Sequence, residues 1–176
     1  FKMVSTCKKI FFVAIIILLN SSLIADTPYF IDFKYVLNES AAGKKAQSAL
    51  KSKLDKGLKS LADKEKALKE SEKKIIQQKK LITPEEYKKK VEELRVKVSG
   101  LQKERNKLLS DISKQRAKAK NELLKTLNPI IENYMKEKNI VMIIDKKNIL
   151  SANNKLDITK EITSLLNQKL KSIKIN

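Results

Sequence analysis

The sequence lacks the side chains on which most active sites and metal centres depend. Histidine is absent, and the single cysteine, Cys7, lies in the N-terminal stretch. The usual general base and thiol nucleophile are therefore missing. There is also no glycine-rich phosphate loop and no metal-ligand spacing. Adjacent acids such as Glu85 and Glu86 are better explained by helix capping and helix surfaces. We therefore expect no enzyme, no cofactor and no metal.

Residues that make loops and globular cores are also scarce. The 176-residue chain has three glycines, three prolines and no tryptophan, and aromatic residues make up 5%. Because loops need glycine and proline, this composition predicts few loops and long helices. So few aromatic residues are a thin supply for a globular core of this length, which favours an elongated shape.

One long apolar run is present, near the N-terminus. The run IFFVAIIILL spans residues 10–19, follows Lys8 and Lys9, and is followed by a polar patch and Ala25. This is the layout of a secretory signal peptide cleaved after Ala25. A permanent membrane anchor is the alternative, but ten apolar residues are too few for a bilayer, which needs about 20. We expect residues 1–25 to be removed on export, together with Cys7.

Acidic residues are outnumbered by basic ones. Without residues 1–25 the chain keeps 36 basic and 20 acidic residues, a net charge of +16. Residues 41–138 hold 28 basic and 14 acidic residues, or +14, and the rest of the exported chain only +2. A solvated helix surface would explain any single lysine. The twofold excess indicates an anionic partner, and because export argues against nucleic acid, acidic polypeptides, anionic lipid and lipopolysaccharide are the candidates.

Heptad spacing marks two long helical segments. In the second segment seven of eight positions spaced by four and three residues are apolar, which predicts a coiled coil: Tyr87, Val91, Leu94, Val98, Leu101, Arg105, Leu108 and Ile112. The first segment follows a similar but more polar frame: Leu54, Leu58, Leu61, Glu65, Leu68, Glu72, Ile75 and Lys79. Gly57 and Gly100 lie inside these segments, either where the helices approach closely or where they bend.

A proline separates the two segments. In LITPEEYKKK, residues 81–90, Thr83 and Glu86 form a capping box around Pro84 at the first helical position. The first helix therefore ends near Leu81 and a second begins at Pro84. Two apolar seams joined by so short a break can bury each other by folding back into an antiparallel hairpin with arms of about 60 Å. A single kinked helix that pairs between chains is the alternative.

The segments outside the hairpin predict a small head. Residues 27–37, 138–145 and 148–154 read as short strands, and residues 156–170 as a helix with Asp157 as its N-cap. Asn128 and Pro129 suggest a second cap and restart, with a kink. A head of about 50 residues is marginal alone, so we expect a homo-oligomer joined through the heads. Its predicted interface residues are Phe30, Ile31, Phe33, Ile140, Val141, Met142, Ile143 and Ile144.

Two stretches resemble the Skp/OmpH family of periplasmic chaperones. YFIDFKYVLNESAAGKKAQ (29–47) resembles the family's opening, with Ser40, Gly43, Lys44 and Ala46 at the matching positions. Residues 140–167 resemble its C-terminal signature through Asp145, Leu150, Asp157, Ile158 and Thr159. The resemblance implies an α+β fold with a long coiled-coil hairpin protruding from a small β-rich head. It also implies a homotrimer in the periplasm that holds unfolded outer-membrane proteins without nucleotide.

These inferences give one layout and one function. We expect a signal peptide at 1–25, a head formed by 26–40 and 139–176, and arms at 41–138 with the tip near 82–84. The function is that of an ATP-independent holdase whose basic arms bind unfolded outer-membrane proteins and prevent aggregation. The alternative is an exported coiled-coil adaptor or spacer. The predicted client-binding residues surround the tip: Lys73, Lys74, Lys79, Lys80, Tyr87, Lys88, Lys89 and Lys90.

Overall fold

The computed structural model describes residues 27–175, so the expected signal peptide and Cys7 lie outside the described residues. Two very long helices dominate, α3 (Ala41–Gln78) and α4 (Pro84–Lys138). The short elements are β1 (Tyr29–Ile31), α2 (Phe33–Glu39), β2 (Ile143–Asp145), the 3-10 turns η1 (Lys146–Asn148) and η2 (Asn154–Leu156), and α5 (Thr159–Lys169). In the described part of the chain, no helix combines the length and the apolar character that a membrane span requires.

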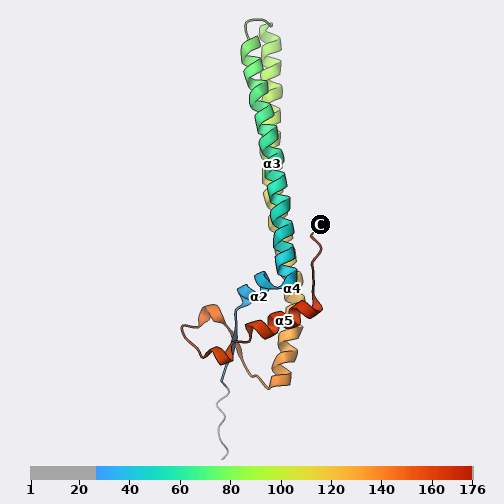
Figure 1. Cartoon of the computed structure of the whole chain (residues 1–176). Helices are drawn as coiled ribbons and strands as arrows, with labels where there is room; N and C mark the ends of the chain where they lie inside the picture. Colours follow the sequence, from blue (N-terminus) through green and yellow to red (C-terminus); the bar gives the residue numbers. More distant parts are fainter. Residues whose placement is uncertain (1–26, 176) are drawn as a thin grey trace, which may run out of the picture.

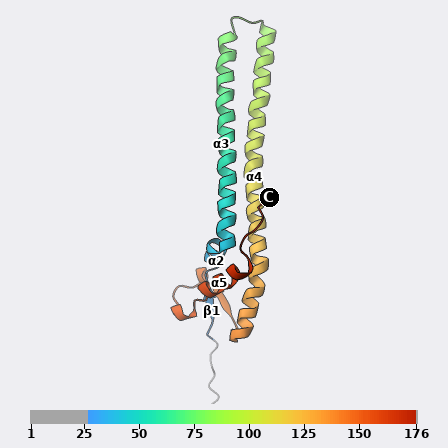
Figure 2. The ribbon, with the colours of Figure 1, turned by 45° about the vertical axis from the view of Figure 1, so that its right-hand side comes forward.

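Helices α3 and α4 form an antiparallel hairpin, which confirms the predicted fold class. The two helices run side by side from the head to the tip (Figures 1 and 2). The capping box is present at the turn: the Thr83 hydroxyl accepts from the Glu86 amide, and the Thr83 amide donates to the Glu86 carboxylate. Helix α3 ends at Gln78 and this cap begins α4 five residues later, and the chain reverses direction in between.

The seam between the arms differs from the predicted frame in the first arm. Leu61 is only 5% exposed, but Leu58 is 42% exposed and turns away from the seam. Gly57 occupies the seam position that was predicted for Leu58. A Cβ added at Gly57 would lie 2.6 Å from the Leu108 side chain. Leu108 therefore packs directly over Gly57, which is a point of close approach. Nothing lies within 4 Å of the corresponding position at Gly100.

Charged pairs cross the seam on both of its sides. Lys64 Nζ lies 2.5 Å from Glu104, and Arg105 lies 3.7 Å from Glu65. Exposed ion pairs of this kind contribute between nothing and about 1 kcal/mol each. They fix the register of the arms more than they stabilise them, so the apolar seam provides most of the stability.

The head brings the beginning of the described chain against its end. Strands β1 and β2 pair in parallel, with Tyr29 opposite Ile143 and Ile31 opposite Asp145. Two strands that lie more than 100 residues apart in sequence are therefore neighbours in the head. Around them α2, α5 and the last turns of α4 close a single core (Figure 2). Its buried residues are Ile31, Val36, Ala42, Leu123, Leu127, Ile130, Ile158, Ile162 and Leu166.

Helix α4 continues through Pro129, so the predicted restart at Asn128 is wrong. A proline inside a helix removes one backbone hydrogen bond and costs roughly 3 kcal/mol. Leu127 and Ile130, on either side of it, are 0% and 3% exposed and belong to the head core. Their burial offsets the cost and keeps this stretch helical.

The predicted strand at 148–154 is also absent. The segment instead contains parts of η1 and η2 with an irregular stretch between them. Each turn starts at a short polar side chain: Asp145 accepts from the Lys147 amide and Asn153 from the Lys155 amide. Side chains that bond their own backbone compete with sheet pairing, and these two turn the chain before a strand can extend.

Candidate functional site

The described residues contain no group of three or more histidine, cysteine, aspartate or glutamate side chains that could hold a metal ion. The surfaces with exposed apolar and cationic side chains are the arms, with their tip and two lateral grooves, and the open side of the head. These side chains can contact apolar and anionic groups of a partner.

The tip brings several of the predicted client-binding residues together across the turn. Lys79 lies over the ring of Tyr87, 5.6 Å from its centroid, which is within range of a cation–π contact. Lys90 donates a hydrogen bond of 2.7 Å to Gln78, and Lys73 forms an ion pair with Glu70. These three cations are thus occupied within the hairpin.

The other predicted lysines are free of such partners. Four of them are exposed and have no ion pair within residues 27–175: Lys74, Lys80, Lys88 and Lys89. An ammonium group without a partner can meet an incoming anion without first breaking a bond. These four residues are the stronger part of the predicted set.

Exposed apolar side chains near the tip were missed by the sequence reasoning. Leu81 is 82% exposed, and Ile76, Val96 and Val98 are each more than half exposed. Ile76 and Val96 fall outside the heptad frame, so an apolar residue off the frame was the available signal. Val98 was assigned to the seam, but it remains open to solvent there. Together with the lysines, these residues make the distal arms both apolar and cationic.

A distal groove runs between the two helices in the half of the arms nearer the tip. Its floor is apolar, and ion pairs cross its rim, joining Glu65 to Lys69 and to Arg105. The floor residues are Leu68, Val91, Leu94, Val98 and Leu101. Because acids and bases on this rim pair with one another, the groove carries little unbalanced charge.

A second groove, here called the base groove, lies where the arms join the head. Its apolar lining comes from Leu37, Ala46, Leu50, Leu54, Ile112, Ala119 and Leu123, and its cations are Lys44, Lys51, Arg116 and Lys120. Lys44 is bound to Glu39 at 2.8 Å, and the hydrogen bond and charge of Glu39 raise the pKa of Lys44. Lys51, Arg116 and Lys120 have no ion pair within the described residues.

The junction of α2 and α3 shapes one end of this groove. The Ser40 hydroxyl caps α3 by accepting from the Gly43 amide. A Cβ at Gly43 would overlap the carbonyl oxygen of Leu37. Helix α2 can therefore pack this closely against the start of α3 only because residue 43 is glycine.

The predicted interface residues of the head fall into two groups. Phe30, Ile31 and Ile140 are buried inside this chain, and Ile31 belongs to the head core. Val141 and Met142, just before β2, are 66% and 55% exposed. Phe33, Ile143 and Ile144 are half-buried. An isolated bridge from Phe30 to Asp157 covers the outer edge of β1, so in the described chain β2 has the open edge.

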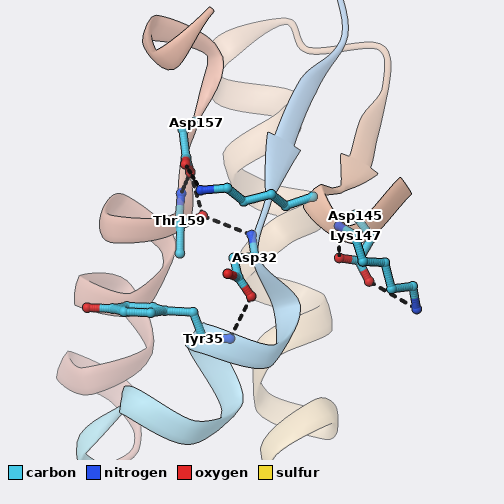
Figure 3. Close-up of polar contacts among 7 residues, drawn as sticks. Asp32, Tyr35, Asp145, Lys147, Asp157 and Thr159 are labelled. Carbon is cyan, nitrogen blue, oxygen red and sulfur yellow. Dashed lines mark hydrogen bonds and ion pairs between the residues drawn. The ribbon is translucent and has the colours of Figure 1, made fainter. Parts of the chain in front are cut away.

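A polar cluster ties the head together (Figure 3). Asp157 accepts hydrogen bonds from the Thr159 amide and hydroxyl and from Lys146, and the Asp32 amide donates to the Thr159 hydroxyl. Burial acts to raise the pKa of Asp157, but these hydrogen bonds and the Lys146 charge outweigh it and hold the pKa below its usual value. The bonds from Asp32 to Thr159 and from Lys146 to Asp157 connect separate segments of the head, so the cluster holds these segments together.

Comparisons with known proteins identify a matching family and a similar solved structure. The model of the family described as "Outer membrane protein (OmpH-like)" matches residues 29–166. The fold is similar to the crystal structure of a Caulobacter crescentus CB15 protein described as an OmpH-like outer membrane chaperone. The TM-score is 0.78 at 18% identity, over 85% of this chain and 90% of that one. No curated protein sequence matches the chain significantly.

Proposed function

The chain belongs to the OmpH-like family of outer membrane proteins, and from that premise we propose that it is an ATP-independent holdase of the periplasm. It binds unfolded outer-membrane proteins between its basic arms and prevents their aggregation. The family is one of chaperones and not of enzymes, which agrees with the lack of histidine in the sequence.

One observation carries the proposal: exposed apolar side chains and unpaired lysines share the distal arms. An unfolded polypeptide exposes apolar side chains, which gain about 25 cal/mol for each Å² that they bury. Leu81, Ile76 and Val96 offer such surface without a deep pocket that would select one sequence. Many weak contacts of this kind hold a client through high effective concentration and still allow it to leave in parts.

The charge of the arms supports the same function. With 28 basic and 14 acidic residues between positions 41 and 138, the arms of neighbouring subunits repel one another at close range. Salt screens this repulsion beyond about 8–10 Å. Repulsion keeps the arms apart and preserves space between them, and the same positive field attracts a net-acidic client from a distance.

The heads join three subunits in this proposal. The head core is small, β2 has an open edge in the described chain, and Val141 and Met142 beside it are exposed. An open strand edge favours pairing with another chain. A trimer joined there places three pairs of arms around one central space.

Aggregation of a diluted porin tests the function. Purified protein is added to an outer-membrane porin diluted out of urea, and light scattering is followed at low and at moderate salt. We expect suppression at roughly stoichiometric amounts, because each trimer encloses one client. No suppression at either salt concentration would favour a coiled-coil adaptor, which needs a single structured partner.

A matched pair of variants locates the activity. The tip variant carries Lys→Gln at Lys74, Lys80, Lys88 and Lys89. The control variant carries Lys→Gln at four exposed head residues, Lys155, Lys160, Lys169 and Lys171. The charge change is equal, so a loss of suppression confined to the tip variant places the client at the tip. An equal loss in both variants would contradict this placement.

A further inference from the structure

We infer that the base groove binds a polypeptide segment in extended conformation, in which apolar and acidic side chains alternate. The inference rests on the proposed chaperone function and assigns to it a second client site, separate from the tip. Seven apolar residues line this groove, and three of its four cations are free of ion pairs within the described residues.

The free cations set the choice of ligand. Lys44 is neutralised by Glu39, but Lys51, Arg116 and Lys120 are exposed on the two opposing helices. In the distal groove the comparable arginine, Arg105, is paired with Glu65 instead. In the base groove, unpaired cations lie beside apolar side chains. This surface is complementary to a ligand that carries both apolar and acidic side chains.

Exposed leucines continue this lining towards the tip. Residues seven apart lie on the same face of a coiled coil. Leu58 lies seven residues from Lys51 of the base groove and seven from Glu65 of the distal groove. On the other arm, Leu109 lies seven residues from Arg116 of the base groove and seven from Gln102 of the distal groove. Both leucines are about half exposed, so exposed apolar side chains link the base groove to the distal groove along this face.

The other face of the hairpin is polar. There Lys64 and Glu104 pair across the seam. At the height of the base groove, exposed Lys53, Lys114 and Lys118 line neither groove. Cations are thus available on both faces, but an apolar lining accompanies them only on the groove face. Charge alone therefore does not define the site, and the apolar lining distinguishes the two faces.

The dimensions suit an extended chain. From Lys44 to Leu54 the first arm rises about 15 Å, which is the length of four or five residues of a strand at about 3.3 Å each. In an extended segment alternate side chains point to opposite sides. Apolar residues can then face Leu50 and Ile112 while the intervening carboxylates face the cations of the rim.

Charge reversal on one face provides the test. The probe is a fluorescein-labelled peptide of about twelve residues in which leucine and glutamate alternate, and its binding to the full protein is followed by anisotropy. The groove variant is Lys51→Glu, Arg116→Glu, Lys120→Glu. The control variant is Lys53→Glu, Lys114→Glu, Lys118→Glu, which changes the net charge equally on the same helices at the same height.

The groove variant should weaken peptide binding about tenfold or more, and the control about twofold or less, since only the first three residues contact the ligand. Peptides with serine for leucine, or with lysine for glutamate, should bind the wild-type protein at least about tenfold more weakly. Equal losses in the two variants would overturn the inference. Binding of phosphatidylglycerol vesicles without binding of the peptide would also overturn it, in favour of a lipid site.

A crosslinking measurement keeps the test valid if charge reversal disturbs folding. Ser48 lines the base groove and Ser52, one turn later, does not, and both are exposed. A photoreactive phenylalanine at position 48 should crosslink the peptide, and one at position 52 should not. Crosslinking only from position 52 would overturn the site. If the wild-type protein suppresses porin aggregation but does not bind the peptide, this inference fails and the proposed function stands.

Discussion

At the scale of single residues, the three glycines have quite different environments. Gly43 allows the end of α2 to touch the start of α3, Gly57 accommodates the Leu108 side chain, and Gly100 faces open space. A methyl group at Gly43 would meet a backbone carbonyl, which cannot move without displacing α2. The cost of a side chain at each position therefore depends on what it would touch, and the sequence alone does not give this.

Alanine at Gly43 and at Gly100 should have opposite effects. We expect Gly43→Ala to destabilise the protein by about 2 kcal/mol or more, because the backbone must shift. Gly100→Ala should stabilise it by about 0.5–1 kcal/mol, because alanine favours a helix over glycine and nothing obstructs it. Urea unfolding at one fixed protein concentration measures both changes. A Gly43→Ala protein as stable as wild type would contradict the close packing of α2 on α3.

At the scale of elements, local signals predicted the hairpin well and the head less well. Thr83, Pro84 and Glu86 are neighbours in sequence and define the turn without help from the rest of the chain. The continuation of α4 past Pro129 depends on Leu127 and Ile130, whose burial involves residues far away in sequence. Leu58 was placed in the seam because its spacing fits, but Gly57 admits Leu108 and shifts the seam by one residue.

The two candidate sites also differ in whether local sequence or distant contacts define them. The lysines of the tip could be named from the sequence because they flank a recognisable turn. The base groove could not be named, because Lys51 and Arg116 face the same space only when the register of the two arms is known.

Loss of the cap should loosen the tip alone. Thr83→Ala removes the hydroxyl that accepts from the Glu86 amide, and such a loss costs about 1 kcal/mol. If the tip opens locally, exchange of the Glu86 and Tyr87 amide hydrogens, which both bond to Thr83, should accelerate roughly fivefold at this cost. Thr126→Ala, which removes a hydroxyl contact with Glu122 inside α4, serves as the control. Unchanged exchange at the tip of the Thr83→Ala protein would show that the turn does not need its cap.

At the scale of the whole molecule, the shape separates two tasks. The arms project from the head as one long hairpin (Figure 1). The head contains the enclosed core and the proposed contacts between subunits, and the arms carry most of the charge. Because few core residues lie along the arms, the arms can adapt to a client without unfolding the head. The proposed assembly depends on the exposed part of the head.

Sedimentation should detect that assembly. We expect analytical ultracentrifugation of the wild-type protein to give a trimer. Val141→Glu combined with Met142→Glu should shift it towards monomer, because the two charges would have to be buried at the interface. Leu109→Glu places a charge on an exposed apolar position of the arm and should leave the trimer intact. A wild-type monomer would argue against joining through the heads.

The pairing of β1 with β2 also constrains the order in which the molecule can form. The Asp32 amide bonds to Thr159, a partner 127 residues further along the chain. During synthesis, β1 therefore has no partner strand until residues 143–145 have emerged, and the Asp32 amide has no partner until Thr159 has. The helical arms, whose contacts are closer in sequence, can be complete before then. A product truncated before α5 would therefore have folded arms and an incompletely folded head.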